Sequence, residues 1–128
     1  ICHNYGWSSE SVDIITIDSL ELGKVDFVKM DIEWYEYEAF LWMKKLLQDN
    51  LDIKIIFEWS PQFYASISDN GKQYSINILK YLTDLWFSLY EVSDKNIWEK
   101  YEITDFDELY NRVWLAFGAH SDIYAIRK

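Results

Sequence analysis

The sequence predicts an α/β fold, in which helices connect the strands of a mainly parallel sheet. Short apolar runs rich in β-branched and aromatic residues, such as residues 53–59, alternate with segments whose apolar residues have helical spacing. Strands separated by crossover helices favour parallel pairing. The chain has 128 residues, half of them hydrophobic, so it is one domain or part of one with a sizeable core.

The first half of the chain predicts two strands and a helix. Residues 1–11 contain glycine and several serines and are a predicted loop, and residues 12–18 are a β-rich run that predicts a short strand. Residues 19–22 are a brief helical turn or loop. Residues 25–31 are mostly apolar, which is typical of a strand covered on both faces. Residues 35–48 predict a helix, because apolar side chains recur every three or four residues and the charges match the helix dipole.

The second half of the chain continues the alternation. Residues 53–59 predict a buried strand, which ends at the turn signal Ser60-Pro61. Residues 62–72 are polar and are a predicted loop. Isoleucine and leucine form an apolar stripe along residues 74–85, which predicts a helix. The remaining predicted elements are a strand at residues 86–92, a loop at 93–101, a short capped helix at 104–109 and a strand at 122–127.

Carboxylates stand at the ends of two predicted strands. Asp31 and Glu33 close the first long strand, where strand alternation would give them the same face, and Glu58 closes the next one. Ligands of open α/β sheets bind beyond the carboxyl ends of the strands, where such groups can bind a hydroxyl or a hard cation, or act as a base. Alternatively, Asp31 and Glu33 cap the following helix and Glu58 pairs with a lysine. Glu36 is expected in the first helical turn as a partner of the helix dipole.

Composition argues against several classes of partner. A formal charge of −10 and a pI near 4.5 oppose binding to a nucleic-acid backbone or an anionic membrane. No apolar run approaches the roughly 18 residues of a membrane span, and no secretion signal is visible, so we expect a cytoplasmic protein. One cysteine and two histidines provide neither an internal disulfide nor a Cys/His zinc site.

The region around the carboxylate pair resembles a known motif. Residues 25–36, with Lys29, Asp31, Glu33 and Glu36 in order, are similar to the Lys-x-Asp-x-Glu-Gly-x-Glu segment of the FkbM-type S-adenosylmethionine-dependent methyltransferases. Weaker similarity is seen elsewhere, so the resemblance covers nearly the whole chain. The weaker matches are the Thr-Leu-Asp-x-Leu-like residues 16–20, the strand and turn at 55–61, residues 85–92 and residues 123–127.

The resemblance implies a class I methyltransferase fold, a Rossmann-like sheet with strand order 3-2-1-4-5-7-6 and an antiparallel strand 7. Residues 1–128 would be the C-terminal half of this single domain, with strands 4, 5, 7 and 6. The glycine-rich turn and the acid that bind S-adenosylmethionine in such enzymes are expected upstream of Ile1, so this piece alone should bind the cofactor poorly. The implied reaction is O-methylation of a small molecule or glycan, with Asp31, assisted by Glu33 or Glu58, orienting or deprotonating the acceptor hydroxyl.

Three tryptophans, Trp34, Trp42 and Trp86, stand where the family pattern has glycine. The chain has seven tryptophans and four glycines, whereas glycine is usually about 7% of residues. We hypothesise that some or all of the three are encoded by UGA codons and are glycine in the natural protein. Some bacterial lineages translate UGA as tryptophan and others translate it as glycine. The alternative is that the tryptophans are genuine and that the protein has diverged.

Two other functions are compatible with the sequence. One is a non-catalytic, degenerate methyltransferase-like module that binds a partner, with the strand at residues 25–31 as an exposed hydrophobic edge. The other is a divalent-metal hydrolase that uses Asp31, Glu33 and Glu58, which the scarcity of histidine disfavours.

Overall fold

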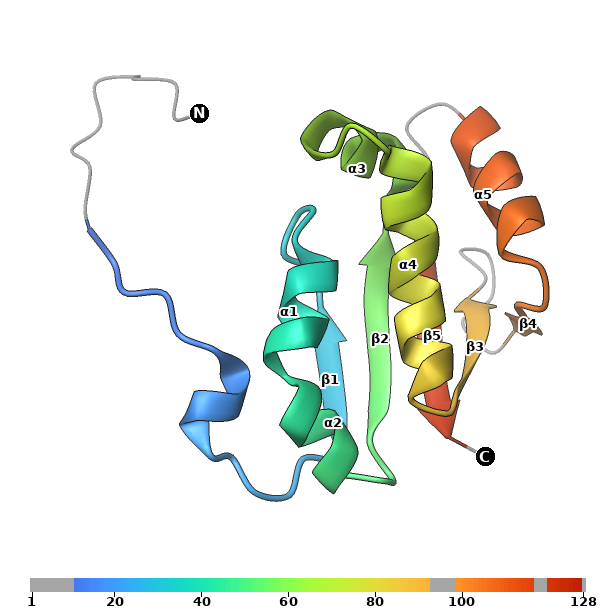
Figure 1. Cartoon of the computed structure of the whole chain (residues 1–128). Helices are drawn as coiled ribbons and strands as arrows, with labels where there is room; N and C mark the ends of the chain where they lie inside the picture. The colour runs from blue at the N-terminus through green and yellow to red at the C-terminus, as the bar shows by residue number, and fades with distance from the viewer. Residues whose placement is uncertain (1–10, 93–98, 117–119, 128) are drawn as a thin grey trace.

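The computed structural model describes residues 11–92, 99–116 and 120–127, which form an α/β fold (Figure 1). The predicted α/β class is therefore confirmed, whereas the predicted loop at residues 1–11 lies almost entirely outside the described residues. The strands are β1 (Phe27–Met30), β2 (Lys54–Trp59), β3 (Phe87–Val92), β4 (Lys100–Glu102) and β5 (Ser121–Arg127). The helices are the 3₁₀ helix η1 (Ile17–Leu20), α1 (Glu36–Trp42), α2 (Lys44–Asp49), α3 (Pro61–Ile67), α4 (Gly71–Asp84) and α5 (Phe106–Leu115).

The described strands form one sheet in the order β1-β2-β5-β3-β4, and among them only β1 and β2 pair in parallel. β5 pairs antiparallel with both β2 and β3, and β4 pairs antiparallel with β3. The prediction of a mainly parallel sheet is therefore wrong. The chain reverses direction at β4, which falls in the predicted loop at residues 93–101, most of which lies outside the described residues. After this reversal α5 returns the chain, so β5 runs opposite to β2 and β3.

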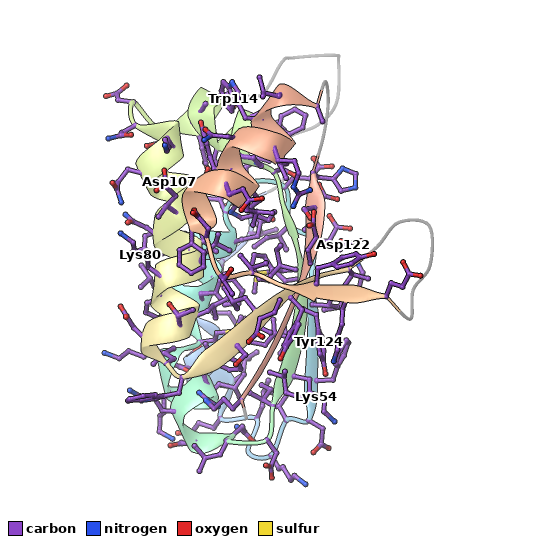
Figure 2. All side chains as sticks on the ribbon, turned by 90° about the vertical axis from the view of Figure 1, so that its right-hand side faces the viewer. Lys54, Lys80, Asp107, Trp114, Asp122 and Tyr124 are labelled. Carbon is purple, nitrogen blue, oxygen red and sulfur yellow. The ribbon has the colours of Figure 1, made fainter. Side chains whose placement is uncertain are left out.

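The helices lie on one face of the sheet. Figure 1 shows α1, α2 and α4 in front of the strands, and Figure 2 shows α4 and α5 on one side of the sheet with the labelled Asp122 and Tyr124 toward the other. Burial follows this arrangement, because Ile55, Phe57 and Trp59 of β2 are fully buried while the alternating residues are half-buried or exposed. The core therefore lies between the sheet and a single layer of helices.

Strand β1 forms one edge of the sheet. The sequence predicts a strand covered on both faces, but Phe27 is 54% exposed and Lys29 is exposed, while Met30 is buried under the helices. The prediction is wrong because, among the described residues, β1 has a neighbour only on its β2 side and helices on only one face. An apolar sequence shows that a strand can be buried on both faces, but it does not show whether other elements pack against both faces.

Two other predicted elements are also wrong. The predicted strand at residues 12–18 is extended chain that leads into η1, and its side chains Val12, Ile14 and Ile15 are exposed without a strand partner among the described residues. The predicted loop at residues 62–72 contains most of α3. Pro61 begins this helix at a position that suits its fixed φ, and Tyr64 is fully buried beneath it. The polar residues of α3 lie outward and concealed the helix in the sequence.

The predicted helix at residues 35–48 is two helices, α1 and α2, which meet at Met43. Asp18 caps the N-terminus of α2, because its carboxylate accepts hydrogen bonds from the backbone N–H groups of Lys45 at 2.9 Å and Leu46 at 2.8 Å. The acid of the Thr-Leu-Asp-x-Leu-like segment therefore caps a helix in this structure. The helical turn predicted at residues 19–22 forms slightly earlier, as η1.

The later elements are close to their predicted positions. The predicted strands at residues 53–59, 86–92 and 122–127 are β2, β3 and β5. Helix α4 begins three residues before its predicted start, where Asn70 caps it by accepting a hydrogen bond from the N–H of Gln73 at 3.2 Å. Helix α5 is longer than predicted and is capped by Asp105. These segments were predictable because their apolar faces all pack into the core.

Glu91 joins β3 to α5 and β5. Its carboxylate accepts hydrogen bonds from Arg112 Nη1 at 3.0 Å and from Ser121 Oγ at 2.7 Å. Burial opposes ionisation here, but the hydrogen bonds from Arg112 and Ser121 outweigh it and lower the pKa of Glu91. A carboxyl whose pKa is lowered by folding stabilises the fold above its unfolded-state pKa, and this contribution is lost as the pH falls through the folded-state value.

We therefore expect Arg112→Met to destabilise the chain at pH 7 and to have a smaller effect at a pH low enough to protonate Glu91 in the folded state, below its lowered pKa. Urea unfolding at the two pH values measures the difference. Lys24→Met is the matched control, since Lys24 pairs with Asp26 at a fully solvated site and should change stability little at either pH. An equal loss of stability for Arg112→Met at both pH values would contradict the role of the ionised Glu91.

Candidate functional site

The carboxyl ends of β1 and β2 bring two predicted site residues to the same edge of the sheet. The last parallel pair is Met30 with Phe57, so Asp31 and Glu58 each follow it by one residue. Neighbouring strands lie about 4.8 Å apart. Asp31 is exposed and pairs with Lys29, whose Nζ lies 3.2 Å from Asp31 Oδ2. Glu58 is half-buried and accepts a hydrogen bond from Ser60 Oγ at 2.8 Å.

Glu33, the third predicted residue, does not share a strand face with Asp31. Strand β1 ends at Met30, and Glu33 and Trp34 adopt positive φ values of 48° and 91°. Residues in the left-handed region reverse the chain, so strand alternation does not extend to this position. Glu33 is an exposed residue of the turn between β1 and α1. The expectation that the two acids point to the same face is wrong because the strand is shorter than predicted.

Glu36 is the residue whose environment the sequence reading missed. It lies in the first turn of α1, as the sequence predicts, but it is buried there and only 2% exposed. Its Oε1 accepts a hydrogen bond from the backbone N–H of Ile32 at 3.4 Å, which closes the turn, and its Oε2 is buried without a hydrogen-bond partner. A buried carboxylate oxygen without a donor is costly. The signal in the sequence was the last acid of the Lys-x-Asp-x-Glu-Gly-x-Glu-like segment.

Two tyrosines surround this acid from α3 and α4. The hydroxyl of Tyr64 donates to the backbone carbonyl of Glu58 at 3.3 Å, and the hydroxyl of Tyr74 donates to Glu38. Burial, together with the negative charge of Glu36, raises the pKa of Tyr64. Burial and the hydrogen bond to Glu38 raise the pKa of Tyr74 well above its ordinary value. Both hydroxyls therefore stay protonated near neutral pH and act as hydrogen-bond donors at the base of the site.

An aromatic pair lies beside the carboxylates. The indole of Trp34 stacks on the ring of Phe63, with the ring centroids 5.1 Å apart and an interplanar angle of 10°. Phe63 belongs to α3, the helix that follows β2, and it is 41% exposed. The turn after β1 and the helix after β2 thus meet over the edge that carries Asp31 and Glu58.

Three cavities of this structure lie away from that edge. One, of about 600 Å³, is lined by residues such as Asp18, Val25 and Asn50, near the amino end of β1. Two cavities of about 380 and 390 Å³ lie around α5. Within the described parts of the chain, no group of three or more acidic, histidine or cysteine side chains is arranged to hold a metal ion. The described residues therefore provide carboxylates at the strand ends, but neither an enclosed cofactor cleft there nor a metal centre.

An open α/β sheet with acids beyond the carboxyl ends of parallel strands is an architecture for binding small ligands. The family comparison makes this specific, because the model of the methyltransferase FkbM domain matches residues 8–109. The chain belongs to the FkbM methyltransferase family, as the motif around Asp31 predicted. No curated protein and no solved structure gave a significant match. Among the described residues, none of the helices has the length and apolar character needed to cross a membrane.

Proposed function

We propose that this chain is the C-terminal half of an S-adenosylmethionine-dependent O-methyltransferase domain that acts on a hydroxyl of a small molecule or glycan. The observation that carries the proposal is the position of Asp31 and Glu58, one residue beyond the last parallel pair of β1 and β2, in a chain of the FkbM family. The spatial order β1-β2-β5-β3 corresponds to the order 4-5-7-6 of the strands in the class I fold, and this correspondence supports the proposal.

The chain contributes groups that handle the acceptor. An acceptor hydroxyl must lose its proton as the new carbon–oxygen bond forms, and a carboxylate within hydrogen-bond distance can take that proton. Asp31 is exposed enough to reach an acceptor, and Glu58, which Ser60 orients at 2.8 Å, stands beside it. Glu33 extends from the adjacent turn. The cofactor supplies an electrophilic methyl group on a cationic sulfonium, which an acidic chain does not repel.

Cofactor binding is assigned to residues outside those described, because no described cavity at the strand ends fits it. Two features support the proposal that further residues of the domain pack against those described. β1 lacks a second strand neighbour among the described residues, and the face of the sheet that carries Tyr124 has no described helix over it (Figure 2). Parallel pairs such as β1 and β2 are typical of sheets covered on both faces, whereas antiparallel strands can leave one face in water. An additional part of the same domain would cover both the edge and the face.

Asp31→Asn in the intact protein is expected to lower the rate of methyl transfer by about 10² to 10⁴, the usual contribution of a positioned acid or base. Glu58→Gln should lower it less. The measurement is methyl transfer from S-adenosylmethionine to hydroxylated acceptors, together with cofactor affinity by calorimetry, which should not change. The matched control is Asp26→Asn, since Asp26 is a solvated acid beyond the other end of β1. A rate for Asp31→Asn that equals the control rate would overturn the role of Asp31.

The exposed edge strand favours a second candidate, a non-catalytic module that binds a partner. Among the residues that the structure describes, no strand pairs with the outer edge of β1, and a partner strand could cover this edge and the 54% exposed ring of Phe27. The same calorimetry separates the candidates. Binding of S-adenosylmethionine by the intact protein supports the enzyme, and the absence of binding supports the partner-binding module.

A further inference from the structure

Two tryptophans of this chain have backbone conformations that suit glycine. Trp34 has a φ of 91° and Trp86 a φ of 69°. For a bulky residue with a Cβ atom, positive φ is a genuine outlier, whereas glycine adopts it without steric cost. Glu21 and Glu33 are the other non-glycine residues with positive φ in the described part of the chain, at 49° and 48°. Trp34 and Trp86 thus depart furthest from the range expected of their residue type.

Trp86 occupies the position after the C-cap of α4. The helix ends at Asp84, Leu85 is its C-cap, and the N–H of Trp86 donates to the carbonyl of Thr83 at 2.9 Å. Glycine is strongly enriched at this position, because the left-handed conformation there closes the helix end. The side chain of Trp86 is 84% exposed, so the core does not hold it in this strained conformation.

Trp34 occupies the reversal between β1 and α1. Its φ of 91°, directly after Glu33 in the left-handed region, lets the chain turn back so that Glu36 reaches the N–H of Ile32. The carbonyl of Trp34 also lies 3.4 Å from the hydroxyl of Tyr74, which donates its one proton to the closer carboxylate of Glu38. These contacts involve the backbone at position 34 and not the indole, so the turn requires the backbone conformation and not the side chain.

The other tryptophans show that this feature is specific. Trp59 lies in strand β2, is fully buried, and donates from Nε1 to the carbonyl of Ser75 at 3.0 Å. Trp42 is the last residue of α1 and its φ is not positive, so the backbone at this position does not require glycine. Tryptophan fits the structure at position 59, while positions 34 and 86 require what glycine provides.

We infer that positions 34 and 86 are glycine positions, and that the organism that makes this protein translates a UGA codon as glycine at both. The composition agrees in direction, since glycine at both positions raises the number of glycines from four to six of 128 residues, which is nearer the usual share of about 7%. One consequence concerns the candidate site. Without the indole at position 34, the ring face of Phe63 is open beside Asp31 and Glu33, where a planar group of an acceptor can stack.

The first test is the gene together with the protein isolated from its own organism. UGA codons at positions 34 and 86, and peptide masses that correspond to glycine at both, are the expected result. UGG codons at these positions, or tryptophan in the peptides, overturn the inference. Neither measurement depends on the folding of the isolated chain.

The second test compares Trp86→Gly with Trp86→Ala. Both remove the exposed indole, but only glycine relieves the positive φ, so we expect Trp86→Gly alone to raise the melting temperature, by about 4 °C. Trp59→Gly is the control and should lower it strongly. An equal rise for alanine and glycine, or no rise for glycine, overturns the assignment of position 86 from the backbone.

Discussion

Trp59→Ala is expected to lower the free energy of unfolding by about 3–5 kcal/mol, a large part of the 5–15 kcal/mol that holds a domain of this size together. The side chain is fully buried at the end of β2. It packs edge-on against Tyr110 of α5, with ring centroids 6.5 Å apart, and donates from Nε1 to the carbonyl of Ser75 in α4. Its removal leaves a cavity where three elements meet and takes away the hydrogen bond.

Urea unfolding measures this effect, with two variants that separate its causes. Trp59→Phe keeps most of the packing but loses the N–H donor, so its cost should be about 1–2 kcal/mol. Trp114→Ala is the surface control, because Trp114 also packs against Tyr110, as a stacked pair, but is 39% exposed, and it should cost less than Trp59→Ala. Equal costs for Trp59→Ala and Trp114→Ala would show that Trp59 is not the centre of the core.

The elements that could be predicted from the sequence are those whose side chains report their own burial. In β2, Ile55, Phe57 and Trp59 point into the core, and in α4 the residues Ile78, Leu79 and Leu82 are fully buried. Periodic apolar positions of this kind identify an element without knowledge of its partners. The candidate site residues Asp31 and Glu58 could also be located from the sequence, because they follow predicted strands. Ligands of open α/β sheets bind beyond the carboxyl ends of the strands.

The elements that could not be predicted depend on partners far away in the sequence. β4 is three exposed residues that become a strand only because β3 offers an edge. α2 begins where its first backbone N–H groups donate hydrogen bonds to Asp18, which lies more than 25 residues earlier in the sequence. Whether each side of β1 is covered depends on the elements that pack beside it, and the apolar sequence of β1 does not identify those elements.

The buried position of Glu36 was hidden for a related reason. Its burial follows from the reversal at Glu33 and Trp34, and positive φ values are normally signalled in a sequence by glycine. Glutamate and tryptophan carry no such signal. The sequence therefore predicts the position of Glu36 in the first helical turn but not its burial, which arises because the turn brings its carboxylate back to the N–H of Ile32.

Gly71→Ala is expected to destabilise the chain by about 2 kcal/mol or more, because α3 and α4 touch at this residue. A Cβ atom at position 71 would lie 2.3 Å from the Cα of Ala65 and 2.7 Å from its backbone nitrogen. Backbone atoms cannot rotate away, so α3 would have to move. α3 carries Tyr64, whose hydroxyl donates to the carbonyl of Glu58, so the movement would reach the strand end that carries a candidate site residue.

Gly23→Ala separates this steric effect from the general cost of replacing glycine. Gly23 has a φ of 69° but no atom within 4 Å of an added Cβ, so its substitution should cost only about 1 kcal/mol of backbone strain. Urea unfolding compares the two variants, and the amide NMR signals of Tyr64 and Glu58 should shift for Gly71→Ala alone. If Gly71→Ala costs no more than Gly23→Ala and leaves those signals in place, the contact between α3 and α4 does not position this end of the sheet.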